Sequence, residues 1–158
     1  RRATLPEKYL QEERLAAAAI SAAFPVLAHK TVLFSGDPHL FSAFSLFALE
    51  LCMRPSLALL DSSPRRLSLP RTPHIMLFQP TLARARELIG NLCPREKPDL
   101  AVMNSFAISE KVAPGIPCVE FGFPSYGHHC LAPEPFLGLS GARMLVSRLL
   151  NSIRSALK

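Results

Sequence analysis

The chain has 158 residues, a formal net charge of +6 and an apolar content of 49%. This length and this apolar content are sufficient for one domain with a sizeable core. No apolar run reaches the roughly 20 residues of a membrane-spanning helix, and no signal peptide is visible. Because the first residue is Arg1 rather than Met, we expect the sequence to be a piece of a longer protein.

Much of the basic excess lies in two places, the stretch 65–71 and the last predicted helix. Aromatic residues do not alternate with these charges, so the pattern favours a solvated surface, or a face for an acidic partner, over nucleic-acid binding. We therefore expect neither nucleic acid nor a membrane as a partner.

The cysteines are scattered and form no C-x-x-C pair: they are Cys52, Cys93, Cys118 and Cys130. This spacing argues against a zinc ribbon and against a dense disulfide framework. Buried thiols in a reducing cytoplasm are the simplest interpretation.

The first predicted element is a helix over residues 6–23. Thr4-x-x-Glu7 is typical of a capping box, and Pro6 suits the first helical turn. The small side chains of this segment would allow close packing on another helix, and Pro25 is expected to end it.

Short apolar runs then alternate with segments of helical periodicity. The predicted strands cover residues 31–35, 56–60, 74–78, 99–103 and 116–121. The predicted helices cover 39–52, 82–92 and 141–157, the last two capped by Thr81 and Ser140, with one or two further turns at 106–112. Residues 61–73 contain three prolines and are predicted to form a loop or a poor helix.

This alternation indicates an α/β fold with a parallel sheet that is covered on both faces. Right-handed crossovers predict a Rossmann-like three-layer α/β/α sandwich with a five-stranded sheet in the order 3-2-1-4-5. We expect this domain to span residues 30–158. Residues 1–29 would form an N-terminal helix that packs on, or links to, a preceding domain.

In such a sheet, ligands bind beyond the carboxyl ends of the strands where the chain reverses direction. Gly36 and Asp37 follow the first strand, Asn104 and Ser105 follow the fourth, and the loop that begins at Gly122 lies beside them. Asp37 would act as a helix cap or as a carboxylate at the mouth of the crevice. Asn104 and Ser105 are site candidates that could equally cap a helix.

No G-x-G-x-x-G fingerprint, Walker phosphate loop or G-x-S-x-G elbow around Ser125 occurs. His128, His129 and Cys130 are the side chains most able to bind a metal or to move a proton. Three adjacent ligands cannot all reach one ion on a regular backbone, so at most two would serve. A pair of surface or capping histidines is the competing interpretation.

Several short motifs occur in a characteristic order along the chain. They are Glu13-Arg14-Leu15, Lys30-Thr-Val-Leu-Phe-Ser-Gly-Asp-Pro38, Pro98-Asp-Leu-Ala-Val-Met-Asn-Ser105, Gly122-Phe-Pro124, and Gly138-Leu-Ser-Gly-Ala142 before a helix with Asn151. With these motifs, nearly the whole chain resembles the C-terminal domain of the nitrogenase component 1 family. That family includes the molybdenum-iron protein subunits, the cofactor-assembly scaffold proteins and the light-independent protochlorophyllide reductases.

The resemblance implies one of three Rossmann-like domains of an oxidoreductase or of a metal-cofactor assembly scaffold. This domain would form one wall of a cavity for an iron-sulfur or molybdenum-iron type cluster. His128 lies ten residues before Gly138, the offset of a cofactor-ligating histidine in the family, and is the one metal ligand that the resemblance implies. Gly36, Asp37, Asn104, Ser105, Ser125 and His129 are the expected cofactor-binding residues.

The resemblance further implies sibling domains, a homologous partner subunit, an ATP-dependent iron-sulfur reductase and a cytoplasmic location. The isolated domain would carry no cofactor and would catalyse nothing. The Gly-Phe-Pro start and the paired histidines are more similar to β-type subunits and assembly proteins, in which His128 would not be a ligand. Two alternatives remain open: a non-redox module that binds a metal chelate or a tetrapyrrole, and a purely structural interaction domain.

Overall fold

The computed structural model describes residues 6–63, 73–126 and 135–156. The elements, in chain order, are α1 (Glu7–Leu27), β1 (Thr31–Gly36), α2 (Pro38–Glu50), β2 (Arg54–Leu60), β3 (Ile75–Phe78), α3 (Leu82–Asn91), β4 (Leu100–Met103), α4 (Ser105–Ser109), β5 (Cys118–Glu120) and α5 (Gly138–Ala156). Within the described ranges, no helix has the length and the apolar content that crossing a membrane requires.

The five strands form one parallel sheet in the order β3-β2-β1-β4-β5. This order confirms the predicted Rossmann-like arrangement. β1 is central and β3 and β5 are the edges, so the chain reverses direction between β1 and β4. All four residues of β4 are buried, as are five of the six residues of β1. Continuous burial of this kind occurs because helices cover both faces of a parallel sheet.

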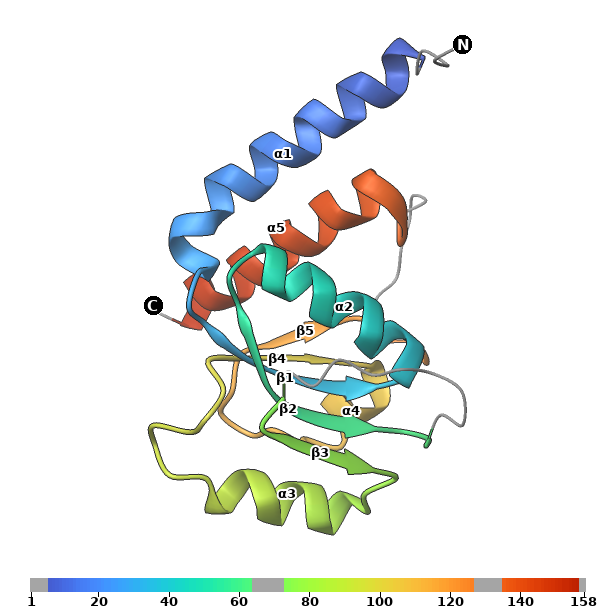
Figure 1. Cartoon of the computed structure of the whole chain (residues 1–158). Coiled ribbons are helices and arrows are strands. Elements are labelled where there is room, and N and C mark those ends of the chain that lie inside the picture. The colour runs from blue at the N-terminus through green and yellow to red at the C-terminus, as the bar shows by residue number, and fades with distance from the viewer. Residues whose placement is uncertain (1–5, 64–72, 127–134, 157–158) are drawn as a thin grey trace.

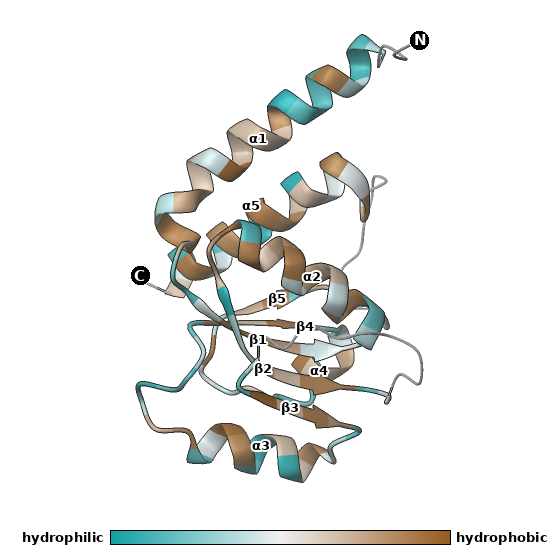
Figure 2. Ribbon diagram, in the orientation of Figure 1, coloured by the Kyte–Doolittle hydropathy of each residue, from teal (hydrophilic) through white to brown (hydrophobic). Residues whose placement is uncertain are grey.

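The helices form one layer on each face of the sheet. The layer of α1, α2 and α5 lies on one face and the layer of α3 and α4 on the other, as Figure 1 shows. Val32 and Phe34 of β1 pack into the core beneath α2 and α5, whereas Leu33 packs into the core on the side of α3. Figure 2 shows that the strands are largely apolar, while the N-terminal half of α1, which extends beyond the other helices, carries several hydrophilic residues.

α1 extends further than the sequence predicted. Pro25 lies inside the helix, which continues to Leu27, and the amide of Ala28 still donates to the Phe24 carbonyl at 2.9 Å. Proline has no amide hydrogen, so Pro25 removes one intrahelical hydrogen bond, but it lies in the last turn and few helical residues follow it. Thr4 lies outside the described residues, and Pro6 occupies the N-cap position without a side-chain cap.

α5 begins three residues earlier than predicted. Ser140 therefore lies inside the first turn and is not the N-cap. Gly138 at the start has a φ of 70°, and the amide of Gly141 donates to the Leu137 carbonyl at 3.2 Å. The residues before Ser140 thus already turn the chain into the helix. At the strands, β5 is shorter than predicted and β2 begins earlier, at Arg54. Most of the loop predicted at 61–73 lies outside the described residues.

The prediction of buried thiols is wrong for three of the four cysteines. Cys52, Cys93 and Cys118 are exposed, and Cys130 lies outside the described residues. Cys52 follows α2 with a φ of 53°, Cys93 follows α3 in a connection, and Cys118 lies on the edge strand β5. All three positions lie at the ends of helices or on an edge strand. At such positions neighbouring elements need not cover an apolar side chain.

Candidate functional site

The carboxyl edge of the sheet brings together the predicted site residues that the structure describes. Gly36 ends β1, and Asn104 directly follows β4 on the neighbouring strand. An ideal Cβ built on Gly36 would lie 4.0 Å from Asn104 Nδ2. The two strand ends therefore meet, as the switch-point argument predicted.

Asp37 is the N-cap of α2. Its Oδ1 accepts hydrogen bonds from the amides of His39, at 2.8 Å, and Leu40, at 3.1 Å. These two amides are among the four that a helix start leaves without intrahelical partners. The helix-cap interpretation of Asp37 is thus confirmed, and a direct role in ligand binding stays a prediction.

Asn104 connects two elements at the site. Its Oδ1 accepts from the amide of Ala107 at 2.9 Å and caps α4, and its Nδ2 donates to the Phe123 carbonyl at 3.2 Å. The residue is only 4% exposed, so both halves of the amide are used in the interior. The start of the loop at Gly122 is thereby held against the end of β4.

A second set of hydrogen bonds, which we call the Glu120 cluster, consists of Ser105, Glu120, Ser125 and Tyr126. Glu120 Oε1 accepts from the hydroxyls of Ser105 and Ser125, each at 2.5 Å. Ser105 Oγ in turn accepts from the amide of Tyr126 at 2.8 Å. The carboxylate of β5 thus ties the start of α4 to residues 125–126, and both predicted serines point toward it.

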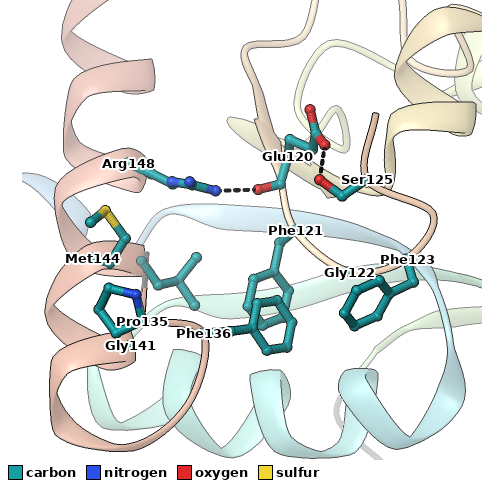
Figure 3. A pocket seen from close by; sticks show the side chains of 11 residues that line it. Glu120, Phe121, Gly122, Phe123, Ser125, Pro135, Phe136, Gly141, Met144 and Arg148 are labelled. Atoms are coloured by element: carbon teal, nitrogen blue, oxygen red, sulfur yellow. Dashed lines mark hydrogen bonds between the residues drawn. The ribbon is translucent and has the colours of Figure 1, made fainter. Parts of the chain in front are cut away.

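A pocket of about 230 Å³, here called the β5–α5 pocket, lies next to the Glu120 cluster (Figure 3). Its lining is mainly apolar and comes from the end of β5, the following loop and α5. The lining residues are Glu120, Phe121, Gly122, Phe123, Ser125, Pro135, Phe136, Gly141, Met144, Leu145 and Arg148.

Three phenylalanine rings form one side of this pocket. The rings of Phe121 and Phe136 stack with centroids 4.9 Å apart and an interplanar angle of 13°, and Phe123 and Phe136 lie 5.5 Å apart. Phe123 is 67% exposed and Phe136 is 37% exposed. An exposed aromatic group beside a pocket is typical of a surface that another molecule covers.

α5 closes the other side of the pocket. Arg148 Nη1 donates to the Glu120 carbonyl at 3.2 Å, so the guanidinium lies over the end of β5 (Figure 3). Gly141 permits the close approach of the chain at Phe136, because a Cβ there would lie 2.6 Å from the Phe136 carbonyl carbon. The position of the Phe136 ring thus depends on a glycine in the first turn of α5.

The donor atoms that the structure describes do not form a metal centre. Among the described residues there is no group of three or more His, Cys, Asp or Glu side chains that could hold a metal ion. Glu120, the acidic residue of the pocket lining, accepts two serine hydroxyls. His128 and His129 lie outside the described residues, so their predicted roles stay predictions.

Sequence reasoning missed several residues of this site, namely Glu120, Arg148 and the three phenylalanines. Glu120 ends an otherwise apolar strand, and a carboxylate in that position is an indication that could have been used. The convergence of Phe136 on Phe121 had no such indication, because it depends on the turn before α5.

Comparisons with known proteins show the family and the fold of the chain. The family model described as nitrogenase component 1 type oxidoreductase matches residues 2–154. A solved structure titled "Nitrogenase Cp1 at pH 6.5" superposes with a TM-score of 0.81 at 22% sequence identity, over 98% of this chain and 35% of that chain. At this identity the superposition shows the shared fold. The chain therefore spans about a third of the length of that nitrogenase chain. No curated protein matches.

Proposed function

This chain belongs to the nitrogenase component 1 type oxidoreductase family, and from that premise we propose that it forms one wall of a metal-cofactor cavity in a larger protein. The larger protein would be an oxidoreductase of this type or a scaffold on which a metal cofactor is assembled. In either case the wall is made by the β5–α5 pocket and the loop that begins at Gly122.

The observation that supports this proposal is the exposed aromatic group at the mouth of the pocket. Phe123 and Phe136 flank, in sequence, the segment 127–134 that contains both histidines. An apolar surface of this kind is suited to the flank of a bulky cofactor, because burial of apolar area is favourable at roughly 25 cal/mol per Å². A pocket of about 230 Å³ is smaller than a typical complete ligand site, so the rest of the enclosure would come from other domains.

The described residues fit a wall and do not fit a complete ligand shell for a cluster. Their donor groups lack the set of three or more that a metal centre needs, so an iron-sulfur or molybdenum-iron type cluster would receive its ligands mainly from outside these residues. His128 is our proposed contribution from this chain, with His129 as a neighbouring hydrogen-bond donor.

The remaining site residues would hold the wall in place. Ser105 and Ser125 fix the loop through Glu120, and Asn104 fixes it through the Phe123 carbonyl. Gly36 and Asp37 would lie at the adjacent strand end. α1 would pack on or link to a preceding domain, and a homologous subunit and an ATP-dependent iron-sulfur reductase would be partners in the cytoplasm.

The aromatic group also favours a second candidate, a non-redox module that binds a tetrapyrrole or a metal chelate. A planar macrocycle stacks well on phenylalanine rings, and the Phe121–Phe136 pair presents such a face. A compact cluster would use the apolar surface without stacking. The two candidates therefore differ in which ligand the exposed ring of Phe123 stabilises.

The test uses the full-length protein, purified without oxygen and without cofactor. It is titrated with isolated iron-molybdenum cofactor and, separately, with protochlorophyllide, while absorbance and bound metal are measured. We expect the iron-molybdenum cofactor to bind saturably. Phe123→Ala should weaken this binding about tenfold, which corresponds to about 1.4 kcal/mol. His128→Ala is expected to weaken cluster binding by at least as much.

Leu46→Ala is the matched control, because Leu46 is 60% exposed on α2 and lies away from the pocket. It should leave binding unchanged. Saturable binding of protochlorophyllide alone would favour the second candidate. Binding of neither ligand, or equal affinities of Phe123→Ala and the wild type, would contradict the proposal.

A further inference from the structure

A second cavity of about 320 Å³ lies at the same edge of the sheet but on the opposite face, beneath α3 and α4; we call it the β1–β2 cavity. Its polar lining comes from Ser35, Asp61, Gln79 and Asn104, and its apolar lining is Leu59, Pro80, Leu82, Ala85, Phe106, Ala107 and Val112. The β5–α5 pocket is built on the other core cluster, so the two cavities are separated by the sheet.

Ser35 is the first unusual feature of this cavity. It is 7% exposed and lies one residue after Phe34, whose side chain faces α2. The alternation of a strand therefore directs Ser35 to the side of Leu33 and α3, into the cavity. Its hydroxyl can both donate and accept a hydrogen bond, so a polar group of a ligand in the cavity could pair with it.

Asp61 supplies charge at the same place. Its amide donates to the Gly36 carbonyl at 3.0 Å, which sets the residue beside the end of β1. Partial burial of the carboxyl group raises the pKa of Asp61, and the nearby charge of Asp37 raises it further. Both effects disfavour the carboxylate, so a positive charge in the cavity would relieve them.

Gln79 completes the polar set. Its backbone φ is 49°, a conformation that residues other than glycine rarely adopt. Its amide donates to the Leu60 carbonyl at 2.7 Å, which holds the residue at the end of the neighbouring strand β3. The Gln79 side chain lines the cavity together with Asp61 and Ser35.

The apolar remainder of the lining distinguishes between a metal ion and an organic cation. A hard metal ion needs about six oxygen ligands, and the described residues offer no cluster of three carboxylate, histidine or cysteine donors. An organic ammonium needs one carboxylate and one or two neutral acceptors. Its hydrocarbon body would pack on Leu59, Leu82 and the exposed ring of Phe106, where an aromatic face also attracts a cation.

We propose that the β1–β2 cavity binds a small organic cation, a primary ammonium or guanidinium group on a compact apolar body. Asp61 accepts the charged hydrogen bond, and Ser35 and Gln79 accept further donors of the same group. The apolar body lies between α3 and α4. This site is independent of the proposed cofactor wall, because it uses the other face of the sheet.

The test uses the full chain, labelled with ¹⁵N, and benzylammonium as the probe. Benzyl alcohol is the neutral probe of the same shape, and Mg²⁺ is the probe for a metal site. We expect saturable binding of benzylammonium in the millimolar range or tighter, with amide shifts confined to residues near 35, 61 and 79. Asp61→Asn should weaken binding at least about tenfold, and Ser35→Ala about threefold.

Glu50→Gln is the matched control, because it removes an exposed carboxylate at the C-terminal end of α2, far from the cavity. It should leave the affinity unchanged. Equal binding of benzyl alcohol, unchanged affinity in Asp61→Asn, or tighter binding of Mg²⁺ at the same residues would overturn the proposal. So would the absence of saturable binding in a wild-type chain that is folded by the same spectra.

Discussion

At the scale of single residues, the pocket depends directly on the absence of a side chain at Gly141. A Cβ there would meet the Phe136 carbonyl carbon at 2.6 Å and the carbonyl oxygen at 2.7 Å. Both are backbone atoms, so neither can rotate away. We predict that Gly141→Ala lowers the free energy of unfolding by about 1–3 kcal/mol, measured by urea denaturation.

Gly90→Ala is the control for this prediction. Gly90 lies near the end of α3, and a Cβ there would meet nothing within 4 Å. Since alanine has the higher helix propensity, we expect the free energy of unfolding to increase by up to about 1 kcal/mol. Equal effects of the two substitutions would show that Phe136 is not held by Gly141.

Asp99 stabilises the amino ends of β1 and β4, at the end of the sheet opposite the candidate site. Its Oδ2 accepts from the Thr31 amide at 2.7 Å and from the Thr31 hydroxyl at 2.9 Å, and Lys30 Nζ lies 3.2 Å from Oδ1. Partial burial raises the pKa of the carboxyl group, but these hydrogen bonds from Thr31 and Lys30 outweigh it, and the pKa lies below its ordinary value of 3.8. The folded state therefore favours the carboxylate.

This lowered pKa makes stability depend on pH. The contribution of Asp99 is fully present above its ordinary pKa and is lost as the pH falls through the lower pKa of the folded state. Because the side chain is 39% exposed, we predict a loss of only about 1 kcal/mol for Asp99→Asn at neutral pH. Urea denaturation from about pH 7 to about pH 2.5 should show that the free energy of unfolding falls less steeply with decreasing pH in the variant than in the wild type.

Glu87→Gln is the matched carboxylate-to-amide control, since Glu87 pairs with Arg84 on the exposed face of α3. It should change stability by less than about 0.5 kcal/mol at any pH. If the free energy of unfolding of Asp99→Asn fell as steeply with decreasing pH as that of the wild type, the interpretation of Asp99 would be contradicted.

At the scale of elements, Asn104 is the connection between α4 and the loop that follows β5. Asn104→Ala removes both the cap on the Ala107 amide and the bond to the Phe123 carbonyl. We predict a loss of about 2 kcal/mol and faster amide exchange in residues 122–126. Asn104→Asp keeps the cap oxygen, but its second oxygen would face the Phe123 carbonyl at a position that is 4% exposed, so it should restore neither the stability nor the slow exchange of the loop.

Thr81→Ala separates capping from anchoring. Thr81 caps α3 through the Arg84 amide at 3.2 Å and has no part in the loop. It should cost about 1 kcal/mol and leave exchange in residues 122–126 unchanged. Normal exchange there in Asn104→Ala would mean that the anchor to Phe123 does not hold the loop.

The elements also show what sequence could and could not reveal. β1 and β4 were predictable because burial on both faces leaves a continuous apolar run, and Thr81 marked the start of α3 correctly. The start of α5 was not predictable, because Gly138 and the turn before it replace the usual cap at Ser140. The Glu120 cluster joins residues 15 and 5 positions apart, and such pairings depend on how β5 lies against α4.

At the scale of the whole molecule, the sheet order follows from the alternation of elements and the right-handed crossover rule. Topology therefore placed Gly36, Asn104 and the loop at Gly122 at one edge before any side chain was known. It could not indicate that this edge has two cavities on opposite faces. That division arises because Phe34 and Ser35 point to opposite sides of β1, one into each core.

The arrangement of the helices supports a role within a larger assembly. α1 packs on α5 and extends beyond it (Figure 1), with Tyr9 56% exposed near its start. Phe123, Tyr126 and Leu137 are exposed near the β5–α5 pocket. The extending half of α1 and the exposed residues near the pocket are the surfaces that we expect sibling domains and a cofactor, respectively, to cover.

The most direct test of the cofactor wall is hydrogen–deuterium exchange of the full-length protein with and without its bound cofactor. We predict slower exchange on cofactor binding in residues 121–126 and 135–141, and unchanged exchange in α3 on the far face. Unchanged exchange in both pocket segments, with the cofactor demonstrably bound, would contradict the proposed cofactor wall and place the cofactor elsewhere.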